Sequence, residues 1–315
     1  MDNNIPISDQ AMRVILDEPY NFPSRAKENL NAVRAGSKAY IERKVEKTLE
    51  HYCITLSSQS IGGVSCLIAR PRTLRSNWKI FYTFGGGFVS GSAYEDLTIA
   101  APVSAITGVE VIIPEYRLAP EYPWPAACDD TMAVYTEICK DRIAMLGESA
   151  GGNLALVTMF RAKKMGLNLP VAAALISPWC DLTNLGDSMD FNDGRDPTLS
   201  LKQSNMAASH YASGQDLTNP EISPIFGEFD HTFPNFFIST GTRDLLMSQS
   251  VLLANKLKAS DISVELNIWE GLWHVFEWNM DLPESTLSLK QISDLKLSRR
   301  IKLISYANNK KKYYY

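Results

Sequence analysis

The feature that most constrains this chain is an alternation between two kinds of segment, which begins near residue 50. Short runs rich in β-branched residues alternate with longer amphipathic runs, a pattern typical of a mostly parallel sheet with helices on both faces. We therefore expect an α/β fold with about eight strands. The expected strands are His51–Ser57, Gly63–Ala69, Lys79–Thr83, Val109–Pro114, Ile143–Leu146, Ala172–Ile176, Phe236–Ser239 and Val264–Ile268. The expected helices are Thr98–Ile106, Ala126–Cys139, Gly151–Lys164, Val251–Ser260 and a last one within Leu287–Tyr306.

Two segments depart from this alternation. Residues 1–50 are typical of polar-faced helices with a break at Glu18–Pro23, and residues 183–233 form a long insertion. Insertions of that length without structure of their own are uncommon in compact domains and tend to be functional. We predict that both segments form a helical cap over the main domain, residues 51–307, and that residues 308–315 are a low-complexity, frayed tail.

Composition and charge exclude several classes of protein. The 315 residues carry 31 Lys and Arg against 35 Asp and Glu, a net charge of −4, which favours neither nucleic acid nor anionic lipid as a partner. The sequence starts without a basic segment followed by an apolar one and has no apolar run long enough to span a membrane, so we expect a cytoplasmic protein. The five cysteines form no C-x-x-C pair, which indicates neither a disulfide framework nor a zinc site.

The strongest local motif is a G-x-S-x-G pentapeptide, Gly147 to Gly151, centred on Ser149. It lies between an apolar run that ends at Leu146 and a helical run that begins near Asn153. A serine at a strand-to-helix turn is held with its hydroxyl above the edge of the sheet, and the flanking glycines leave room for the tight turn. We predict that Ser149 is a nucleophile.

One of the four histidines is a suitable base for this serine. A serine hydroxyl is a weak nucleophile, and histidine is the side chain that takes up its proton near neutral pH. His51 falls in the first expected strand, and His210 and His231 fall in the insertion. Only His274 follows a core strand, in a loop at the sheet edge where Ser149 is expected, so we predict it as the base.

Two aspartates compete for the third position of a catalytic triad. Asp244 lies in the loop after the strand that precedes the one presenting His274, which fits the order Ser…Asp…His. Asp181 lies in the loop after an earlier strand. We predict Asp244 as the acid that orients His274, with Asp181 as the competitor.

Three consecutive glycines offer donors for an oxyanion. Gly85, Gly86 and Gly87 follow an expected strand, and without Cβ atoms their backbone can approach a tetrahedral intermediate closely. We predict an oxyanion hole made by the amides of Gly85, Gly86 and Ala150, the residue after the nucleophile. The run does not fit a dinucleotide-binding G-x-G-x-x-G pattern, and no P-loop lysine follows it.

These residues belong to a longer series of motifs that resembles the α/β hydrolases of the hormone-sensitive lipase type, especially their bacterial esterases. The resemblance covers about residues 60–290. It rests on Gly85–Phe88 with Gly91-Ser92, Tyr116–Glu121 with Pro123–Ala126, Gly147–Gly152, Ser177–Trp179, Asp244 and His274–Phe276. The likeness is greatest to carboxylesterases and monoterpene lactone hydrolases, through Gly271–Phe276 and the Asp196-Pro197 step. It implies an α/β-hydrolase fold with a cap, carboxylic-ester hydrolysis, and a triad of Ser149, Asp244 and His274.

Two positions depart from the family pattern. Phe84 replaces the histidine before the glycines, and Glu148 replaces the aspartate before the nucleophile. Plant gibberellin receptors resemble the same family but lack a working triad histidine, so a non-catalytic, small-ligand-binding protein is the alternative function. The presence of His274 favours the enzyme.

We predict a serine carboxylesterase that hydrolyses short- to medium-chain esters or lactones through an acyl-enzyme intermediate, with no metal or organic cofactor. Its partner is a small-molecule substrate, and Phe88 and Trp179 are candidate apolar walls of the substrate pocket. The sequence leaves the oligomeric state open, a homodimer included.

Overall fold

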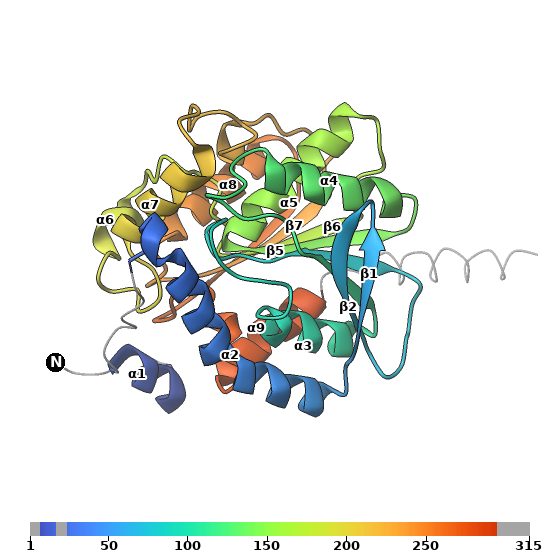
Figure 1. Ribbon diagram of the computed structural model, residues 1–315, viewed down its shortest axis with the longest axis horizontal. Coiled ribbons are helices and arrows are strands. Elements are labelled where there is room, and N and C mark those ends of the chain that lie inside the picture. The colour runs from blue at the N-terminus through green and yellow to red at the C-terminus, as the bar shows by residue number, and fades with distance from the viewer. Residues whose placement is uncertain (1–6, 17–23, 295–315) are drawn as a thin grey trace, which may run out of the picture.

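The computed structural model describes residues 7–16 and 24–294, and its centre is one eight-stranded sheet (Figure 1). The strands are β1 (Thr55–Ile61), β2 (Val64–Arg70), β3 (Lys79–Thr83), β4 (Glu110–Pro114), β5 (Ile143–Glu148), β6 (Ala172–Ile176), β7 (Asn235–Gly241) and β8 (Val264–Trp269). Their order across the sheet is β1-β2-β4-β3-β5-β6-β7-β8. Strand β2 is antiparallel to both of its neighbours, and every other pair is parallel. The predicted fold class is confirmed.

The first predicted strand is placed too early in the sequence. Residues 51 and 52 are the last turn of helix α2 (Leu30–Tyr52), and β1 begins only at Thr55. The helix ends at Cys53, which adopts a left-handed conformation with φ of 52° and donates its amide to the carbonyl of Glu50. A short alternating segment fits the end of an amphipathic helix as well as the start of a strand, so the pattern alone did not separate them.

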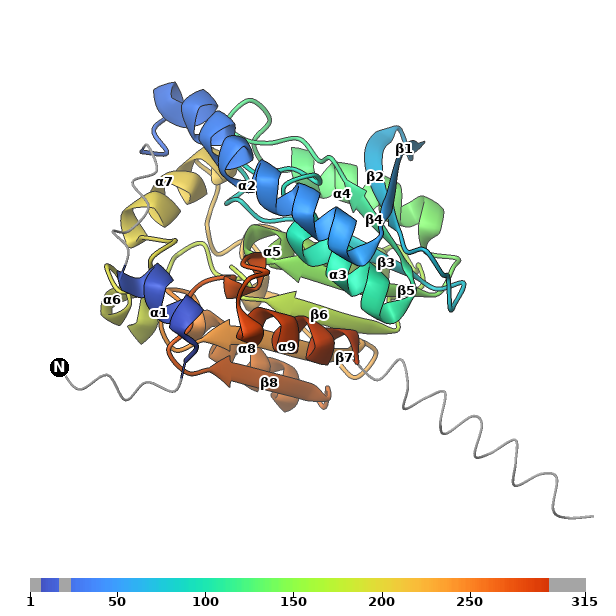
Figure 2. The same ribbon diagram turned by 90° about the horizontal axis from the view of Figure 1, so that it is seen from below.

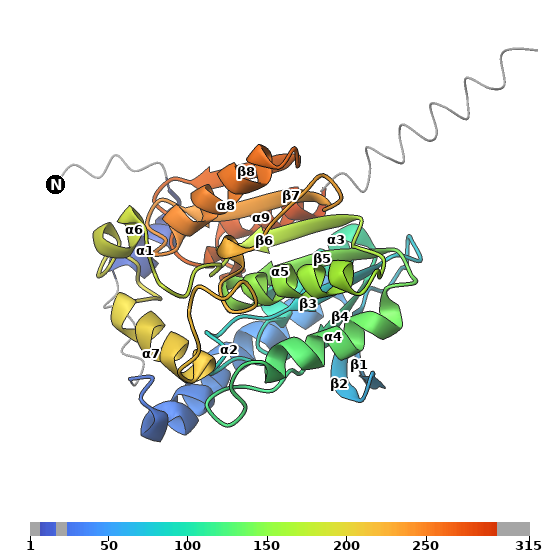
Figure 3. The same cartoon turned by 90° about the horizontal axis from the view of Figure 1, so that it is seen from above.

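Helices cover both faces of the sheet. Helices α3 (Leu97–Thr107) and α9 (Pro283–Ser293) lie on one face, and α4 (Ala126–Ile138), α5 (Ser149–Lys164) and α8 (Met247–Ala259) lie on the other (Figures 2 and 3). Side chains alternate between two cores along β3, where Ile80 and Tyr82 join one core and Phe81 joins the other. This alternation follows from the two-residue period of a strand that is buried on both faces.

The parallel strands bring three loops to one edge of the sheet. Strands β5, β7 and β8 all run in the same direction, so the segments that follow their carboxyl ends are neighbours. Ser149 follows β5, Asp244 follows β7 and His274 follows β8. The topology thus gathers residues that are far apart in the sequence.

Helices from the two segments outside the alternation lie at this edge. The first turns of α2 lie near α7 (Leu201–Ala212) in all three views (Figures 1, 2 and 3). Helix α1 (Asp9–Leu16) packs through Ala11 with residues of the segment after β8, and it lies apart from α6 (Asp187–Phe191) in Figure 1. Short 3₁₀ turns are η1 (Lys27–Asn29), η2 (Pro224–Phe226) and η3 (Phe276–Trp278). The predicted tail at residues 308–315, and the last predicted helix beyond residue 294, lie outside the described residues. Among the described helices, none is long and apolar enough to cross a membrane.

Candidate active site

Ser149 occupies the sharp turn between β5 and α5. Its backbone is in the left-handed region, with φ of 51°, a strained conformation for a residue with a side chain. The flanking glycines are required because a Cβ on Gly151 would lie 2.0 Å from the carbonyl oxygen of Thr83, and one on Gly147 would lie 2.5 Å from that of Gly151. The predicted strand–turn–helix setting of Ser149 is confirmed.

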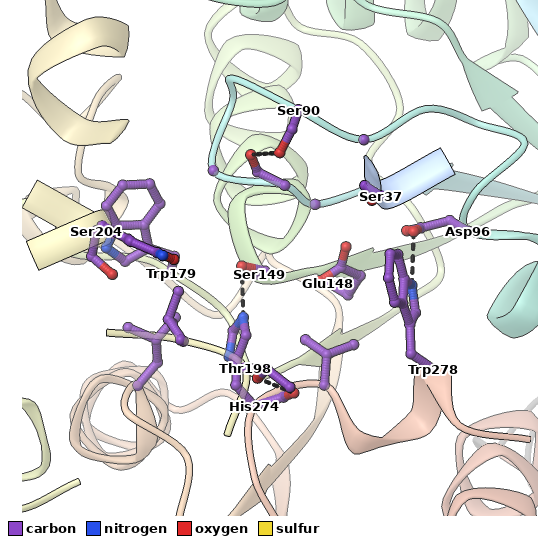
Figure 4. A pocket seen from close by; sticks show the side chains of 18 of the residues that line it. Ser37, Ser90, Asp96, Glu148, Ser149, Trp179, Thr198, Ser204, His274 and Trp278 are labelled. Atoms are coloured by element: carbon purple, nitrogen blue, oxygen red, sulfur yellow. Dashed lines mark hydrogen bonds between the residues drawn. The ribbon is translucent and has the colours of Figure 1, made fainter. Parts of the chain in front are cut away.

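His274 faces Ser149 from the loop after β8. Its Nε2 atom lies 2.9 Å from Ser149 Oγ (Figure 4). The other three histidines lie elsewhere: His51 is in the last turn of α2, His210 is on α7, and His231 is in a turn of the insertion. Of the four, His274 is the one that can take the Ser149 proton.

Asp244 completes the chain of hydrogen bonds. Its Oδ1 lies 3.0 Å from His274 Nδ1, while its Oδ2 accepts from the Thr240 hydroxyl at 2.7 Å. Burial favours the neutral carboxyl, but the charge and hydrogen bond of His274 outweigh it, so the pKa of Asp244 is lowered. Burial likewise opposes the imidazolium, but the carboxylate of Asp244 outweighs it and the pKa of His274 is raised.

Asp181 has a local role. Its Oδ1 accepts from the backbone amide of Thr183 at 2.8 Å, and its own amide donates to the Gln249 side chain at 3.0 Å. The side chain therefore braces the loop after β6. Of the two predicted candidates, Asp244 is the one whose carboxylate contacts His274.

The glycine loop presents its amides differently from the prediction. The Gly85 amide hydrogen bonds to the Glu148 carboxyl group, and a Cβ on Gly85 would lie 2.0 Å from Glu148 Oε1. Within the described part of the chain, the amides of Gly86 and Gly87 donate to no protein acceptor. Ala150 lies in the first turn of α5, where amides have no intrahelical acceptor. The structure thus favours Gly87 over Gly85 as a companion of Gly86 and Ala150.

A family model described as the alpha/beta hydrolase fold matches residues 80–278. The chain belongs to the α/β-hydrolase family. An esterase of Acinetobacter venetianus is 31% identical over 228 residues, which cover 70% of this chain and 74% of the relative. An acetyl-hydrolase of Streptomyces hygroscopicus is 28% identical over 217 residues, which cover 67% of this chain and 72% of the relative.

Solved structures place this α/β hydrolase among the esterases of the hormone-sensitive lipase type. A hormone-sensitive lipase from a metagenome library superposes with a TM-score of 0.82 at 30% identity, over 91% of this chain and 95% of that one. An esterase from the bacterial hormone-sensitive lipase family superposes with a TM-score of 0.82 at 25% identity, over 91% and 97%. The predicted family and enzyme class are confirmed: the protein is a carboxylic ester hydrolase.

A cavity of about 260 Å³ opens beside the triad of this hydrolase. Ser149, His274, the glycine loop and Trp179 line it, together with Trp278 and Leu199 (Figure 4). Phe88, the other predicted wall residue, is not among the described residues that line the cavity. Its ring is fully buried and stacks on Tyr211 with the ring centroids 3.7 Å apart. An aromatic residue beside a glycine motif does not by itself reveal on which side of the loop its ring packs.

Phe84, the first departure from the family pattern, holds the glycine loop by packing. Its buried ring stacks on Tyr116 with centroids 4.1 Å apart and an interplanar angle of 12°. The Tyr116 hydroxyl donates to the carbonyl oxygen of Phe84 at 2.6 Å. The loop is thus fixed by an aromatic stack and by the hydrogen bond from the Tyr116 side chain to the backbone, in place of an imidazole.

Glu148, the second departure, forms a buried carboxyl pair with Asp96. Burial, reinforced by the charge of Asp96, raises the pKa of Glu148 well above its usual value. Burial also raises the pKa of Asp96 to about 6, while hydrogen bonds from Tyr82, Trp278 and Glu148 oppose that rise. The two carboxyl groups are hydrogen-bonded to each other and line the cavity, so their protonation is coupled.

Three residues of this site carried no motif in the sequence: Asp96, Asp196 and Arg25. Asp96 and Arg25 line the cavity, and Asp196 contacts the backbone of the triad loops. The Asp196-Pro197 step was noted only as a family likeness. No role was predicted for Asp196, because its burial and its contacts with the triad loops are not visible in the sequence.

Proposed function

We propose that the protein is a serine esterase that works through an acyl-enzyme intermediate. Ser149 attacks the ester carbonyl, His274 takes its proton and then protonates the leaving alcohol, and Asp244 holds the tautomer of His274 that can accept the proton. Water then hydrolyses the acyl-enzyme with the same base. The observation that carries the proposal is the unbroken hydrogen-bonded series from Ser149 Oγ through His274 to Asp244.

The negative charge of the tetrahedral intermediate needs fixed donors. We assign them to the amides of Ala150 and Gly86, with Gly87 in the place predicted for Gly85, because the Gly85 amide already has Glu148 as its acceptor. Each such donor typically contributes about 10²–10³ in kcat.

The dimensions of the cavity support small substrates. A volume of about 260 Å³, bounded by Trp179, Leu199 and Val275, suits short- to medium-chain esters or lactones. The direct test is steady-state hydrolysis of a series of 4-nitrophenyl esters with acyl chains from acetate to dodecanoate. We expect the highest kcat/KM among the shorter chains and a steep fall beyond octanoate, with Ser149→Ala as the inactive control.

The alternative function is that of a non-catalytic ligand-binding protein. This function requires a catalytically inactive triad. The hydrogen bond between His274 and Ser149 disfavours that alternative. A purified protein that hydrolyses none of these esters above the rate of Ser149→Ala would favour the binding protein.

A further inference from the structure

One wall of the cavity carries a cation that has no counter-ion among the described residues. Arg25 precedes α2 in the chain and lines the same cavity as Ser149 and His274. Within the described part of the chain, its guanidinium forms neither a hydrogen bond nor an ion pair. Burial lowers the pKa of Arg25 to about 10, and the charge of Glu148 opposes this shift, so the side chain remains protonated at neutral pH.

The backbone around Arg25 is anchored to the insertion. The Arg25 carbonyl oxygen lies 3.0 Å from His210 Nε2, and the hydroxyl of the preceding Ser24 lies 3.7 Å from Met206 Sδ. Both partners are on α7. These two contacts hold Ser24 and Arg25 against α7 and direct the Arg25 side chain into the cavity.

The guanidinium lies directly against the glycine loop. A Cβ built on Gly87 would be 2.4 Å from Arg25 Nη1 and 3.2 Å from Ala207 Cβ. The charge also reaches the base, since Arg25 contributes a lowering effect to the pKa of His274. Arg25 is therefore placed beside the position where an ester carbonyl must lie to be attacked by Ser149.

No carboxyl group of the described residues forms an ion pair with Arg25. Glu148 is the group whose charge acts on Arg25, but burial raises the pKa of Glu148 well above its usual value, which weakens this compensation. Asp96, which pairs with Glu148, already accepts hydrogen bonds from the Tyr82 hydroxyl at 2.7 Å and from the Trp278 indole at 2.8 Å (Figure 4). A partly buried guanidinium that has no partner among the described residues is stabilised when a ligand supplies an anion.

We propose that Arg25 binds an ionised carboxylate of the substrate, so that the preferred substrates are esters that carry a carboxylate in their acyl or their alcohol half. This inference rests on the proposed esterase function. The planar guanidinium presents paired N–H donors that match the two oxygens of a carboxylate, and such charge-assisted pairs are strongest where water is excluded. The remaining walls of the cavity, which include Trp179, Leu199 and Val275, would contact the apolar part of the same ester.

The test uses two pairs of esters that differ in charge and little in size. In the first pair, monoethyl adipate carries a carboxylate in its acyl half and ethyl hexanoate carries none. In the second pair, 4-acetoxybenzoate carries a carboxylate in its alcohol half, and methyl 4-acetoxybenzoate is its neutral counterpart. The full-length wild type is compared with Arg25→Gln, with Arg25→Lys, and with Arg72→Gln, which removes an exposed arginine in the loop between β2 and β3.

The expected result is a loss that depends on substrate charge. Arg25→Gln should lower kcat/KM for the anionic ester of at least one pair by about 10- to 100-fold. The fall in kcat/KM for the neutral ester of the same pair should be at least about tenfold smaller. Arg25→Lys should retain part of the preference, because the charge remains while the paired donors are lost. Arg72→Gln should behave as the wild type with all four esters. The pair that responds locates the carboxylate in the acyl or the alcohol half.

Two results would overturn the inference while leaving the esterase intact. In the first, Arg25→Gln slows neutral and anionic esters equally, which would mean that Arg25 acts on the oxyanion or on the fold. In the second, Arg25→Gln slows neither member of either pair. A wild type inert toward all four esters would instead contradict the proposed esterase function, and the inference would fall with it.

Discussion

The carboxylate of Asp196, which belongs to the insertion, accepts a hydrogen bond from the backbone amide of His274 with an N–Oδ2 distance of 3.2 Å. The same oxygen accepts the amide of Leu245, the residue after Asp244, at 2.9 Å. One buried side chain thus fixes the backbone beside both the base and the acid of the triad. Its other oxygen accepts the amide of Thr198, which lines the cavity. Asp196 therefore links the insertion, the triad and the substrate cavity.

We predict that Asp196→Asn impairs catalysis without touching a triad side chain. The carboxylate oxygens face N–H donors, so an amide NH₂ group would be turned against at least one of them. We expect kcat for a short nitrophenyl ester to fall by about 10- to 100-fold, because displaced reacting groups lose rate steeply. The matched control is Asp190→Asn, an exposed aspartate in the same insertion, which should leave kcat unchanged. Equal kcat values for the two variants would contradict the positioning role.

The second prediction separates the two candidate acids. Asp244→Asn should lower kcat by about 10⁴-fold, as in the serine-protease case, because the amide favours the wrong imidazole tautomer. Asp181→Asn should cost far less, since the Asp181 carboxylate contacts Thr183 in its own loop. Steady-state kinetics of both variants with one ester checks this. The assignment of Asp244 is wrong if Asp181→Asn proves the more damaging change.

The third prediction concerns pH. His274 must be neutral to accept the serine proton, so kcat/KM should rise with pH through the pKa of His274 in the free enzyme. Although burial opposes the imidazolium, Asp244 raises the pKa of His274, so activity should be lost as pH falls through a midpoint above about 6.5. A pH profile of kcat/KM for a substrate without ionisable groups measures this midpoint. A midpoint at or below 6.5 would show that the stabilisation of the imidazolium by Asp244 does not outweigh its burial.

The fourth prediction tests the first departure from the family pattern. Phe84 fixes the glycine loop through its stack on Tyr116, while the donor amides belong to other residues. Phe84→His should therefore change kcat by less than the contribution of one oxyanion donor, well under about 100-fold. Kinetics of both proteins with a short nitrophenyl ester decides the point. An inert wild type that Phe84→His activates would mean that the loop does not form an oxyanion hole here.

Much of the site could be predicted from the sequence because its chemistry is tied to local patterns. The strand–turn–helix setting of Ser149 required only the residues around it, and strand order placed Asp244 and His274 at the same edge. The predicted strands also lie close to the observed ones, because strands buried on both faces leave distinct apolar runs. His51 is the exception, since a helix end and a strand start share the same short alternation.

The rest depended on contacts between segments that have no common pattern. Arg25 and Asp196 reach the site only because residues before α2 and the insertion pack against the sheet edge. The Gly85 amide was predicted as an oxyanion donor because the sequence does not show that Glu148 turns toward it. Phe88 was predicted to line the cavity, but its ring packs against Tyr211 instead. The sequence does not show on which side of a loop a ring will pack.

The most direct test of the account is covalent labelling of Ser149 by a fluorophosphonate, followed by peptide mass spectrometry. The wild type should gain one adduct on the peptide that contains Ser149, because only a serine activated by His274 attacks the probe at a useful rate. Ser149→Ala, folded as judged by its melting transition, should gain none, and His274→Ala should label far more slowly. A folded wild type that stays unlabelled at Ser149, or that labels no faster than His274→Ala, would contradict the account.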